Sequence, residues 1–423
     1  MNAALPKLVL GPAEAVVATD SPVGHVPHIT VGTFCETPGS LAVISAAAED
    51  RRLSRAVTAN SMGGIPQAIA FCRSHPTPDL LLLESSSPRD ALLAQLDELA
   101  TVCDAATKVV VIGRSNDVSL YRDLMDRGIS DYIVGPTETL MVIAAVLRLF
   151  TRAGAVKPGG ICAFIGAKGG VGSSVIAQNL GWNIAQELAR PVLLADMDLQ
   201  FGSVSLNLNL ETASGFADQL GGAARKDDVG RLDDGLFNRL LVRRGRFLSV
   251  LPSGNAMRVV SEPGPEILNR MLELAQASFT VAVLDLPHAW TPWVRGALAA
   301  ADEVIITAEP DLGNLRNAKR LIDLLRTLRP NDGPPRLVLN KVGVPARKEI
   351  KTTEFAAALQ IEASATFAFE PRCFSSASNS GQLLAETATR TTSKRPFASL
   401  VQALVDRKDA PPKPATPARF WRR

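Results

Sequence analysis

Gly166-Ala-Lys-Gly-Gly-Val-Gly-Ser-Ser174 is the stretch of the sequence that decides the fold. It follows the apolar run Ile161–Ile165, which predicts a short buried strand, and it precedes Ser174–Ala189, whose apolar spacing predicts a helix. A glycine-rich turn between a strand and a helix exposes backbone N–H groups at the positive end of the helix dipole, and this geometry holds phosphate. The stretch therefore predicts a phosphate-binding loop.

The loop departs from the general pattern G-x-x-x-x-G-K-[ST] at two positions. Ala167 stands at the first glycine, and Ser173 stands where a lysine would touch the outer phosphates. Ser174 keeps the hydroxyl that binds Mg²⁺, and Lys168 is an additional early lysine. Lysine followed by Gly-Gly-x-Gly resembles the deviant Walker A loop of the MinD/ParA ATPases, in which the early lysine reaches across a dimer to the partner's nucleotide. The alternative is an ordinary glycine-rich turn.

Length and charge limit the class of protein. A chain of 423 residues is long for one hydrophobic core, so two domains are expected. The net charge of +3 does not by itself indicate binding to nucleic acid or membrane. The charge is unevenly placed, because residues 394–423 hold eight Lys/Arg against two Asp, which gives +6 in that segment.

Cysteine use and hydropathy indicate the compartment. The five cysteines are scattered and form no C-x-x-C pair, which argues against a disulfide framework or a zinc site and fits a reducing compartment. No basic region followed by an apolar core marks a signal peptide, and no apolar run is long enough to span a bilayer. We therefore expect a cytoplasmic protein.

Alternation of strands and helices predicts the architecture, which is α/β with two doubly wound parallel-sheet domains. We expect a disordered leader at 1–38, a first domain at 39–150, a linker at 151–160, a second domain at 161–406 and a proline-rich basic tail at 407–423. In the first domain, strands are expected at Leu41–Ser45, Asp79–Leu83, Lys108–Gly113 and Asp131–Val134, with helices at Asp50–Val57, Pro88–Val102 and Leu120–Arg127.

The first domain resembles a response-regulator receiver. Pro78-Asp-Leu-Leu-Leu-Leu-Glu84 and Asp131-Tyr-Ile-Val-Gly-Pro136 are similar to the third and fifth strands of that fold. Phosphotransfer needs an acidic pair, an acceptor Asp and a Lys, yet Ser45-Ala46-Ala47 follows the first expected strand, and Glu84 and Gly135 stand at the other two positions. We therefore expect a pseudo-receiver that accepts no phosphate, with Glu84 as a solvated carboxylate at a strand end.

Two acidic motifs follow buried strands of the second domain. The expected strand Val192–Ala195 leads into Asp196-Met-Asp198, and the expected strand Phe279–Leu284 leads into Asp285-Leu-Pro-His288. Ligand sites in open α/β sheets lie beyond the carboxyl ends of the strands, where the phosphate loop also lies. Nucleotide hydrolysis needs phosphate neutralisation, a metal and an ordered water, so we expect these groups to form one site.

The resemblance to MinD/ParA proteins implies roles for single residues. Asp285-Leu-Pro287 resembles their switch II, and Thr307–Leu312 followed by Leu315–Leu321 resembles their T-x-P-E-L…L-R-D-A motif. The implied cofactors are ATP and Mg²⁺. The implied nucleotide-binding residues are Lys168, Gly169, Gly170, Val171, Gly172, Ser173, Ser174, Pro371 and Asn340, which matches the adenine-reading asparagine. The implied metal ligands are Ser174, Asp285 through water and, as a minor candidate, Asp196, and the implied catalytic residues are Asp198 and, across a dimer, Lys168.

The whole layout resembles the CpaE/TadZ pilus-assembly proteins, over about residues 40–405. Glu370-Pro-Arg-Cys-Phe374 and Ala377-Ser-Asn-Ser-Gly-Gln382 are similar to that family's C-terminal signature. The resemblance implies a homodimer formed on ATP binding, and a role in placing and assembling the Flp/Tad pilus secretion machine at a cell pole. The implied partners are the secretion ATPase and other Tad assembly proteins.

Two hypotheses follow from these residues. The first is a nucleotide-switched localisation factor with slow or absent hydrolysis, which Ser173 favours. The second is an active partition or division-positioning ATPase acting on DNA or membrane. Domain two offers no basic DNA-binding helix, and the proline-rich tail argues against an amphipathic membrane helix, so nucleic acid is not expected and membrane association is peripheral at most. We expect Arg419-Phe-Trp-Arg-Arg423 to be a short docking segment.

Overall fold

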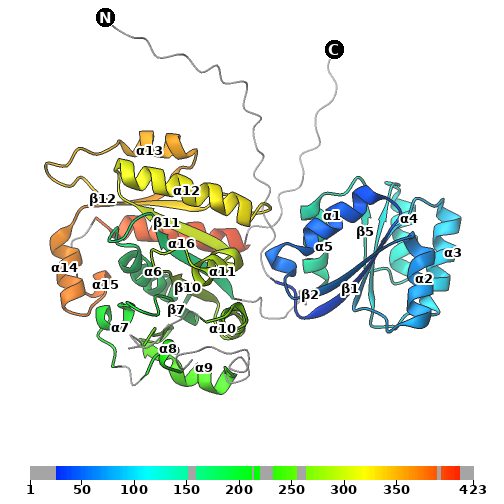
Figure 1. The fold of residues 1–423 in the computed structure, drawn as a ribbon, viewed down its shortest axis with the longest axis horizontal. Helices are drawn as coiled ribbons and strands as arrows, with labels where there is room; N and C mark the ends of the chain where they lie inside the picture. The colour runs from blue at the N-terminus through cyan, green and yellow to red at the C-terminus, as the bar shows by residue number, and fades with distance from the viewer. Residues whose placement is uncertain are drawn as a thin grey trace, which may run out of the picture.

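The computed structural model describes residues 25–150, 159–211, 214–219, 232–254, 263–387 and 392–409. Within these residues the chain forms two α/β bodies, one around a five-stranded sheet and one around an eight-stranded sheet (Figure 1). This arrangement confirms the expected fold class. The docking segment expected at 419–423 lies outside the described residues.

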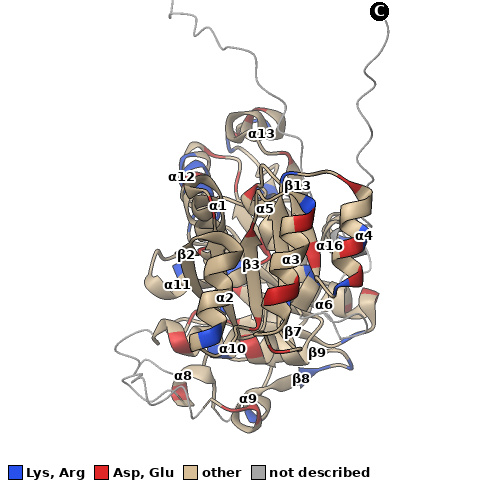
Figure 2. Cartoon of the chain, turned by 90° about the vertical axis from the view of Figure 1, so that its right-hand side faces the viewer, with Lys and Arg blue, Asp and Glu red and all other residues tan. Residues whose placement is uncertain are grey.

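The first sheet has the strand order β2-β1-β3-β4-β5, and all of its strand pairs are parallel. Helices α1 and α5 cover one face of it, and helices α2, α3 and α4 cover the other, each with its own apolar cluster. The charged residues of this body lie mainly on its helices and loops (Figure 2). Its elements are β1 (Ile29–Cys35), α1 (Pro38–Ala48), η1 (Arg51–Leu53), β2 (Ala56–Met62), α2 (Gly64–Ser74), β3 (Leu80–Glu84), α3 (Arg89–Ala100), β4 (Lys108–Gly113), α4 (Val118–Asp126), β5 (Asp131–Val134) and α5 (Thr139–Phe150).

The start of this body differs from the expectation. Strand β1 lies inside the expected leader 1–38, so the sheet begins before residue 39, while residues 1–24 lie outside the described part. The strand expected at Leu41–Ser45 is wrong, because these residues belong to α1, where Pro38 starts the helix and Thr37 caps it. The helix expected at Asp50–Val57 is also wrong, since a short 3-10 turn and the start of β2 take its place.

Glu84, at the end of β3, is not the solvated carboxylate that was expected. It is 8% exposed and accepts hydrogen bonds from the Glu36 and Thr37 amides and from the Thr37 and Ser40 hydroxyls, at 2.7–2.8 Å. Burial alone would raise the pKa of Glu84, but these four donors lower it below its ordinary value. The carboxylate therefore balances the positive end of the α1 dipole and links the end of β3 to the segment between β1 and α1.

Glu84→Gln should lower the free energy of unfolding by about 1–3 kcal/mol at pH 7, because a neutral amide cannot accept four hydrogen bonds as a carboxylate does. A lowered pKa means that this stability is present above the ordinary pKa of 4.5 and is lost as the pH falls below it. Urea unfolding at pH 7 and at pH 3.5 measures both effects. Glu98→Gln, at an exposed ion pair with Arg73, is the control and should change little. An equal effect of both substitutions at pH 7 would contradict the prediction.

The second sheet has the strand order β13-β12-β11-β6-β10-β7-β9-β8 and is parallel except for the β8–β9 pair at one edge. Strands β6, β7 and β10 and helix α6 lie where the sequence predicted strands and a helix. The first elements are β6 (Gly160–Gly166), α6 (Ser173–Leu188), β7 (Val192–Asp196), α7 (Val204–Asn207), α8 (Phe216–Gln219), α9 (Asp234–Leu240), β8 (Val242–Arg244), β9 (Leu248–Leu251), α10 (Pro265–Ser278) and β10 (Val281–Asp285). The remaining elements are α11 (Pro292–Ala300), β11 (Glu303–Ala308), α12 (Leu312–Leu328), β12 (Arg336–Val342), α13 (Thr352–Leu359), β13 (Ala363–Ala368), α14 (Pro371–Asn379), α15 (Leu384–Thr387) and α16 (Lys394–Asp409).

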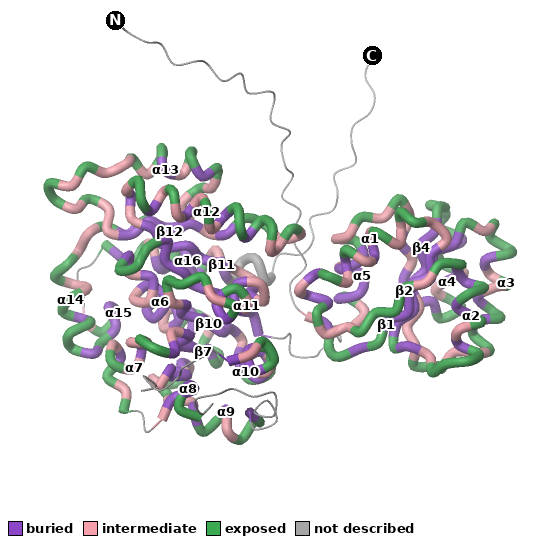
Figure 3. The backbone as a smooth tube through the Cα atoms, in the orientation of Figure 1, coloured by how far each residue is buried: buried purple, intermediate pink, exposed green. Residues whose placement is uncertain are grey.

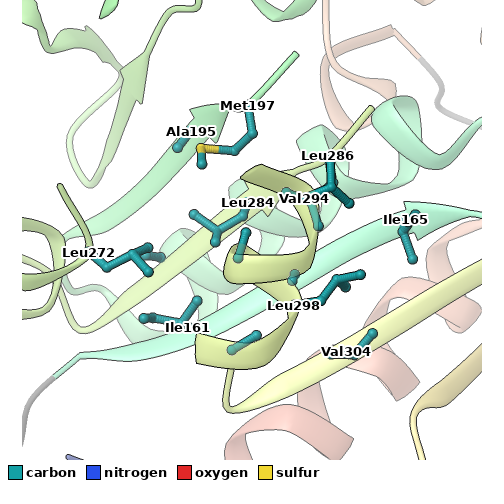
Figure 4. Packing of buried hydrophobic residues seen from close by; sticks show 14 of the residues in the cluster. Ile161, Ile165, Ala195, Met197, Leu272, Leu284, Leu286, Val294, Leu298 and Val304 are labelled. Atoms are coloured by element: carbon teal, nitrogen blue, oxygen red, sulfur yellow. The ribbon is translucent and has the colours of Figure 1, made fainter. Parts of the chain in front are cut away.

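Two apolar clusters cover the faces of the second sheet. Helices α10, α11 and α12 bury one face, and helices α6 and α16 bury the other, so the central strands are buried along their length (Figure 3). Figure 4 shows Val294 and Leu298 of α11 beside the strands that carry Ile165 and Val304. This burial fixes the strand ends of β6, β7 and β10, from which the candidate site is built.

A cluster of buried charges joins the two bodies. We call Arg51, Arg52, Asp302, Arg329 and Asp332 the interdomain ion cluster. Arg51 pairs with Asp302 at 3.0 Å and with Asp332 at 2.9 Å, and the three side chains are only 7–11% exposed. Asp302 directly precedes β11 and Asp332 precedes β12, so the first body contacts the amino-terminal edge of the second sheet. The phosphate loop follows β6 at the opposite, carboxyl-terminal edge.

Candidate functional site

The predicted phosphate loop connects β6 to α6, as expected. The amide of Ala167 donates to the carbonyl of Thr307 at 2.8 Å, which ties the loop to the end of β11. Gly170 and Gly172 have φ of 78° and 86°, a left-handed backbone that favours glycine. A Cβ on Gly172 would also lie 2.5 Å from the side-chain nitrogen of Asn340, whereas one on Gly169 would meet open space. The loop thus ends at the amino terminus of the long helix α6, a position suited to an anion.

The two departures from the general loop pattern lie in different surroundings. Lys168 is exposed, so its ammonium group is available to a ligand or a second molecule. Ser173, the first residue of α6, is 8% exposed, and its hydroxyl is buried without a hydrogen-bond partner in the described structure. The position of the missing lysine is therefore buried, and its hydroxyl has no hydrogen-bond partner among the described residues.

Asp196 and Asp285 lie side by side, because the last residues of β7 and β10 are paired in register. Burial raises the pKa of Asp285 well above its ordinary value, and the charge of Asp196 raises it further, while hydrogen bonding by Ser174 opposes the shift. One carboxylate oxygen of Asp285 is buried and has no hydrogen-bond partner among the described residues. A buried carboxylate in this state needs a cation or a proton to balance it.

Asp196 and Asp198 already have hydrogen-bond partners within the protein. Burial raises the pKa of Asp196 to about 7, and its oxygens accept hydrogen bonds from the amides of Val204 and Asp198 and from the hydroxyl of Ser253. Asp198 is partly exposed, and one of its oxygens accepts the amide of Phe201 at 2.9 Å, which shapes the turn after β7. Asp196 is therefore less available than Asp285 as a metal ligand, while Asp198 keeps one carboxylate oxygen for another role.

The residues present fit Mg²⁺. The carboxylate of Asp285, which has one oxygen without a partner among the described residues, lies beside the hydroxyl of Ser174. A hydroxyl and a water-bridged carboxylate are oxygen ligands of the kind that Mg²⁺ takes together with phosphates. In the part of the chain that the structure describes, no group of three or more His, Cys, Asp or Glu side chains could hold a metal by itself. Most ligands of a magnesium ion at Ser174 would therefore come from the nucleotide and from water.

Asn340 and Pro371 were both expected at the nucleotide. Asn340, near the end of β12, is 5% exposed and donates from its side-chain nitrogen to the carbonyl of Val171 at 2.8 Å. The structure therefore brings Asn340 to the loop. Pro371 is exposed in the first turn of α14, which follows β13 at the edge of the sheet, three strands away from β6.

Three further side chains contact the loop and were not predicted. His288 shares a hydrogen bond with the carbonyl of Gly166, Asn317 donates to that of Ala167, and Lys341 donates to that of Gly170. His288 and Asn317 belong to motifs that the sequence did show, yet nothing in their spacing indicates that the side chains turn towards the loop. Lys341 directly follows Asn340, which was expected at the nucleotide, and this adjacency is the one sequence feature that could have pointed to Lys341.

Large apolar side chains are exposed on segments that follow the strand ends of this site. Phe201 and Leu206 follow β7, Trp290 follows β10, and Leu312 begins α12 after β11. Phe201, Leu206 and Leu312 are each more than 70% exposed. All four side chains follow strands at their carboxyl ends, as the predicted phosphate loop does.

The described helices include none that is long and apolar enough to cross a membrane. Comparison with known proteins finds a matching family model and several relatives. The family model of the cellulose biosynthesis protein BcsQ matches residues 160–322. The septum site-determining protein MinD of Bacillus subtilis (strain 168) is 28% identical over 180 residues, which are 41% of this chain and 62% of that protein. This chain thus spans less than two thirds of that curated relative, and about half of two mycobacterial ones.

Solved structures give the same fold. A ParA family ATPase from Chlorobium tepidum TLS is 21% identical, with a TM-score of 0.52, and the match covers 58% of this chain and 99% of that one. MinD of Pyrococcus horikoshii OT3, solved with Mg-ADP, is 17% identical, with a TM-score of 0.50, and the match covers 58% and 96% of the two chains. At these identities the likeness shows the fold alone.

A closer sequence likeness shows the family. The pilus assembly protein CpaE of Caulobacter crescentus CB15 is 45% identical, with a TM-score of 0.30, and the match covers 30% of this chain and 98% of that one. The identity along nearly the whole of that solved chain carries the assignment, and the phosphate loop with its two acidic strand ends agrees with it. This chain therefore belongs to the CpaE-type proteins of the MinD/ParA-like family.

Proposed function

We propose that this chain binds ATP with Mg²⁺, dimerises when it does so, hydrolyses ATP slowly or not at all, and serves as a localisation and assembly factor for a Flp/Tad pilus secretion machine. One observation carries the proposal: an amide-rich loop at the start of α6 lies at the same sheet edge as the unpartnered oxygen of Asp285. A triphosphate with its magnesium ion satisfies both groups at once.

Nucleotide binding is supported by the loop and its surroundings. The amides of residues 169–174 would hold the phosphates, and Ser174 with Asp285 would hold the metal. Asn340, whose side-chain nitrogen donates to the carbonyl of Val171, would face the base. Mg²⁺ would neutralise the phosphates, and Asp198, through its second oxygen, would orient water. Pro371 would line the base side only if α14 moves towards the loop. That MinD of Pyrococcus horikoshii was solved with Mg-ADP supports this assignment.

Dimerisation is supported by the surface around the loop. Lys168 is exposed, and four exposed apolar side chains follow the neighbouring strand ends. A second copy of the chain would cover these side chains and bring its own Lys168 towards the first copy's phosphates. The charge that Ser173 does not supply would then be present only in the dimer.

The cellular role rests on the likeness to the Caulobacter pilus assembly protein. The secretion ATPase and other Tad assembly proteins are the proposed partners, a cell pole is the proposed site, and any membrane association would be peripheral. An active partition-type ATPase acting on DNA or membrane is the competing function. Brisk turnover by single subunits, together with DNA or vesicle binding, would favour that function instead.

Lys168→Ala should abolish ATP-dependent dimerisation while leaving nucleotide binding nearly unchanged, because the lysine acts on the other subunit's nucleotide. Sedimentation velocity of the full chain, with and without Mg-ATP, measures the dimer, and a fluorescent ATP analogue measures binding. Lys351→Ala is a matched control, since Lys351 is an exposed lysine at the start of α13 whose ion pair in the described structure is with Glu354.

Three outcomes would count against the proposal. A wild-type chain that binds no ATP would remove the nucleotide function. A wild-type chain that binds ATP and stays monomeric would remove the switch. Dimerisation that survives in Lys168→Ala would place the lysine on its own subunit's phosphates, or on none.

A further inference from the structure

Four side chains hold the backbone carbonyls of the phosphate loop. We call His288, Asn317, Asn340 and Lys341 the carbonyl clamp. Their nitrogen atoms lie 2.9, 2.9, 2.8 and 2.6 Å from the carbonyl oxygens of Gly166, Ala167, Val171 and Gly170, respectively. The clamp comes from three separate places in the second body, which are the segment after β10, helix α12 and the end of β12.

The clamp fixes the direction of the loop amides. A peptide unit is planar, with its carbonyl and the following N–H group on opposite sides. Holding the carbonyls of Gly170 and Val171 against Lys341 and Asn340 therefore turns the amides of Val171 and Gly172 away from that side. A loop of glycines has many other conformations, and the cost of ordering it would otherwise be met when the ligand binds.

Lys341 is the member of the clamp that carries charge, and its charge is already balanced. Its ammonium group lies 2.9 Å from a carboxylate oxygen of Glu309, which also pairs with Arg347. Lys341 adopts φ of 53°, a left-handed conformation that a residue with a side chain rarely takes. Such a conformation persists only where the surroundings require it, and here it brings the side chain onto the loop.

We infer that Lys341 is a positioning residue of the phosphate loop, which with the rest of the clamp holds the loop in its anion-binding shape before a nucleotide arrives. The inference rests on the proposed nucleotide function for the identity of the ligand. It explains how a loop without the usual lysine can bind phosphate: with Ser173 neutral, the backbone amides supply the contacts, and their value depends on being ordered in advance.

Hydrogen–deuterium exchange of the full chain without nucleotide tests the clamp directly. The amide of Ala167, near the start of the loop, donates to Thr307, and the amide of Ile176 in α6 donates to the loop carbonyl of Gly172, so both report opening of the loop. Lys341→Gln should make peptides that cover the loop exchange at least about fivefold faster, since loss of a charge-assisted hydrogen bond shifts a local opening equilibrium by that amount or more. Lys341→Arg keeps the charge and the donor and should restore most of the protection.

The control is Lys319→Gln, because Lys319 is about as exposed as Lys341 and also pairs with a carboxylate, but lies on the outer face of α12. It should leave the exchange of the loop unchanged. Asn317→Ala removes the hydrogen bond that α12 makes to the carbonyl of Ala167, and it should also speed exchange of the peptides that cover the loop. Loop exchange that is unchanged in Lys341→Gln would overturn the inference, whatever the result for Asn317→Ala.

A second measurement separates positioning from direct contact with phosphate. If Lys341 orders the loop, Lys341→Gln should weaken Mg-ATP and Mg-ADP by the same factor, about tenfold. If Lys341 instead touches the outer phosphate, ATP should lose affinity and ADP should not, with exchange of the free loop unchanged, and the inference fails. A wild-type chain that binds neither nucleotide would remove the proposed function, while the exchange experiment would still decide on the clamp.

Discussion

Arg51→Met should lower the free energy of unfolding by about 3 kcal/mol and should separate the unfolding of the two bodies. The guanidinium bridges Asp302 and Asp332 across the contact between the two bodies, and the three side chains are only 7–11% exposed. Removing one partner of a buried ion pair leaves uncompensated charge, which costs about 3–5 kcal/mol. The lower end applies here, because Asp332 keeps Arg329 at 2.8 Å and Asp302 keeps the amide of Ile161.

Calorimetry of the full chain at pH 7 measures the effect, with one cooperative transition expected for the wild type and two for Arg51→Met. Arg73→Met removes an exposed ion pair and should shift the transition very little. Adding Asp302→Asn to Arg51→Met should recover part of the loss, since it removes one of the stranded charges. Equal effects of Arg51→Met and Arg73→Met would show that the ion cluster does not hold the bodies together.

The cluster also gives the contact a pH dependence. Burial alone would raise the pKa of Asp332, but the hydrogen bond and charge of Arg51, with the charges of Arg329 and Arg52, lower it to about 2. A lowered carboxylate pKa contributes stability that is present above the ordinary value of 3.8 and is lost as the pH falls from there towards 2. The difference between the wild type and Arg51→Met should therefore shrink over the same range.

The features that sequence predicted are those set by local pattern. The strand–loop–helix around residue 170 and the acidic ends of β7 and β10 depend on neighbouring residues, and parallel pairing then brings the strand ends together. Strand β1 was missed because it follows a stretch rich in Pro, Gly and Ala. Strand β2 was missed because it lies at the sheet edge, where most of its side chains are exposed and no apolar alternation is needed.

The features that sequence did not predict depend on contacts between distant residues. Arg51 and Asp302 are 251 positions apart, and Lys341 is 171 positions from Gly170. Neither pair forms a sequence motif. A charged residue looks the same in sequence whether its partner is water or a distant group of the protein. Glu84 was misjudged for this reason: its strand was predicted correctly, but its four donors come from the loop after β1 and from α1, in a part of the chain where the elements were assigned wrongly.

Ser173→Lys should strengthen the binding of Mg-ATP by about 10- to 150-fold. A hydrogen bond to a charged group contributes about 1.5–3 kcal/mol, and a lysine at this position would give the outer phosphates a full positive charge where serine offers a neutral hydroxyl. The hydroxyl of Ser173 has no partner in the described structure, so the substitution breaks no hydrogen bond there. Ser173→Met is the matched control, because it adds length and volume without charge and should not raise the affinity.

Turnover should respond in a different way. A phosphate-loop lysine binds the outer phosphates more strongly as negative charge shifts in the transition state. Without that lysine, the wild-type chain should hydrolyse ATP very slowly. Hydrolysis should occur only at protein concentrations where a dimer supplies Lys168 of the second subunit. Ser173→Lys should raise the rate and make it less dependent on concentration. Asp198→Ala, added to Ser173→Lys, should abolish the gain, because Asp198 is proposed to orient the attacking water. Brisk wild-type hydrolysis that does not change with protein concentration would show that the missing lysine is already replaced within one subunit, and the proposed division of roles between Ser173 and Lys168 would be wrong.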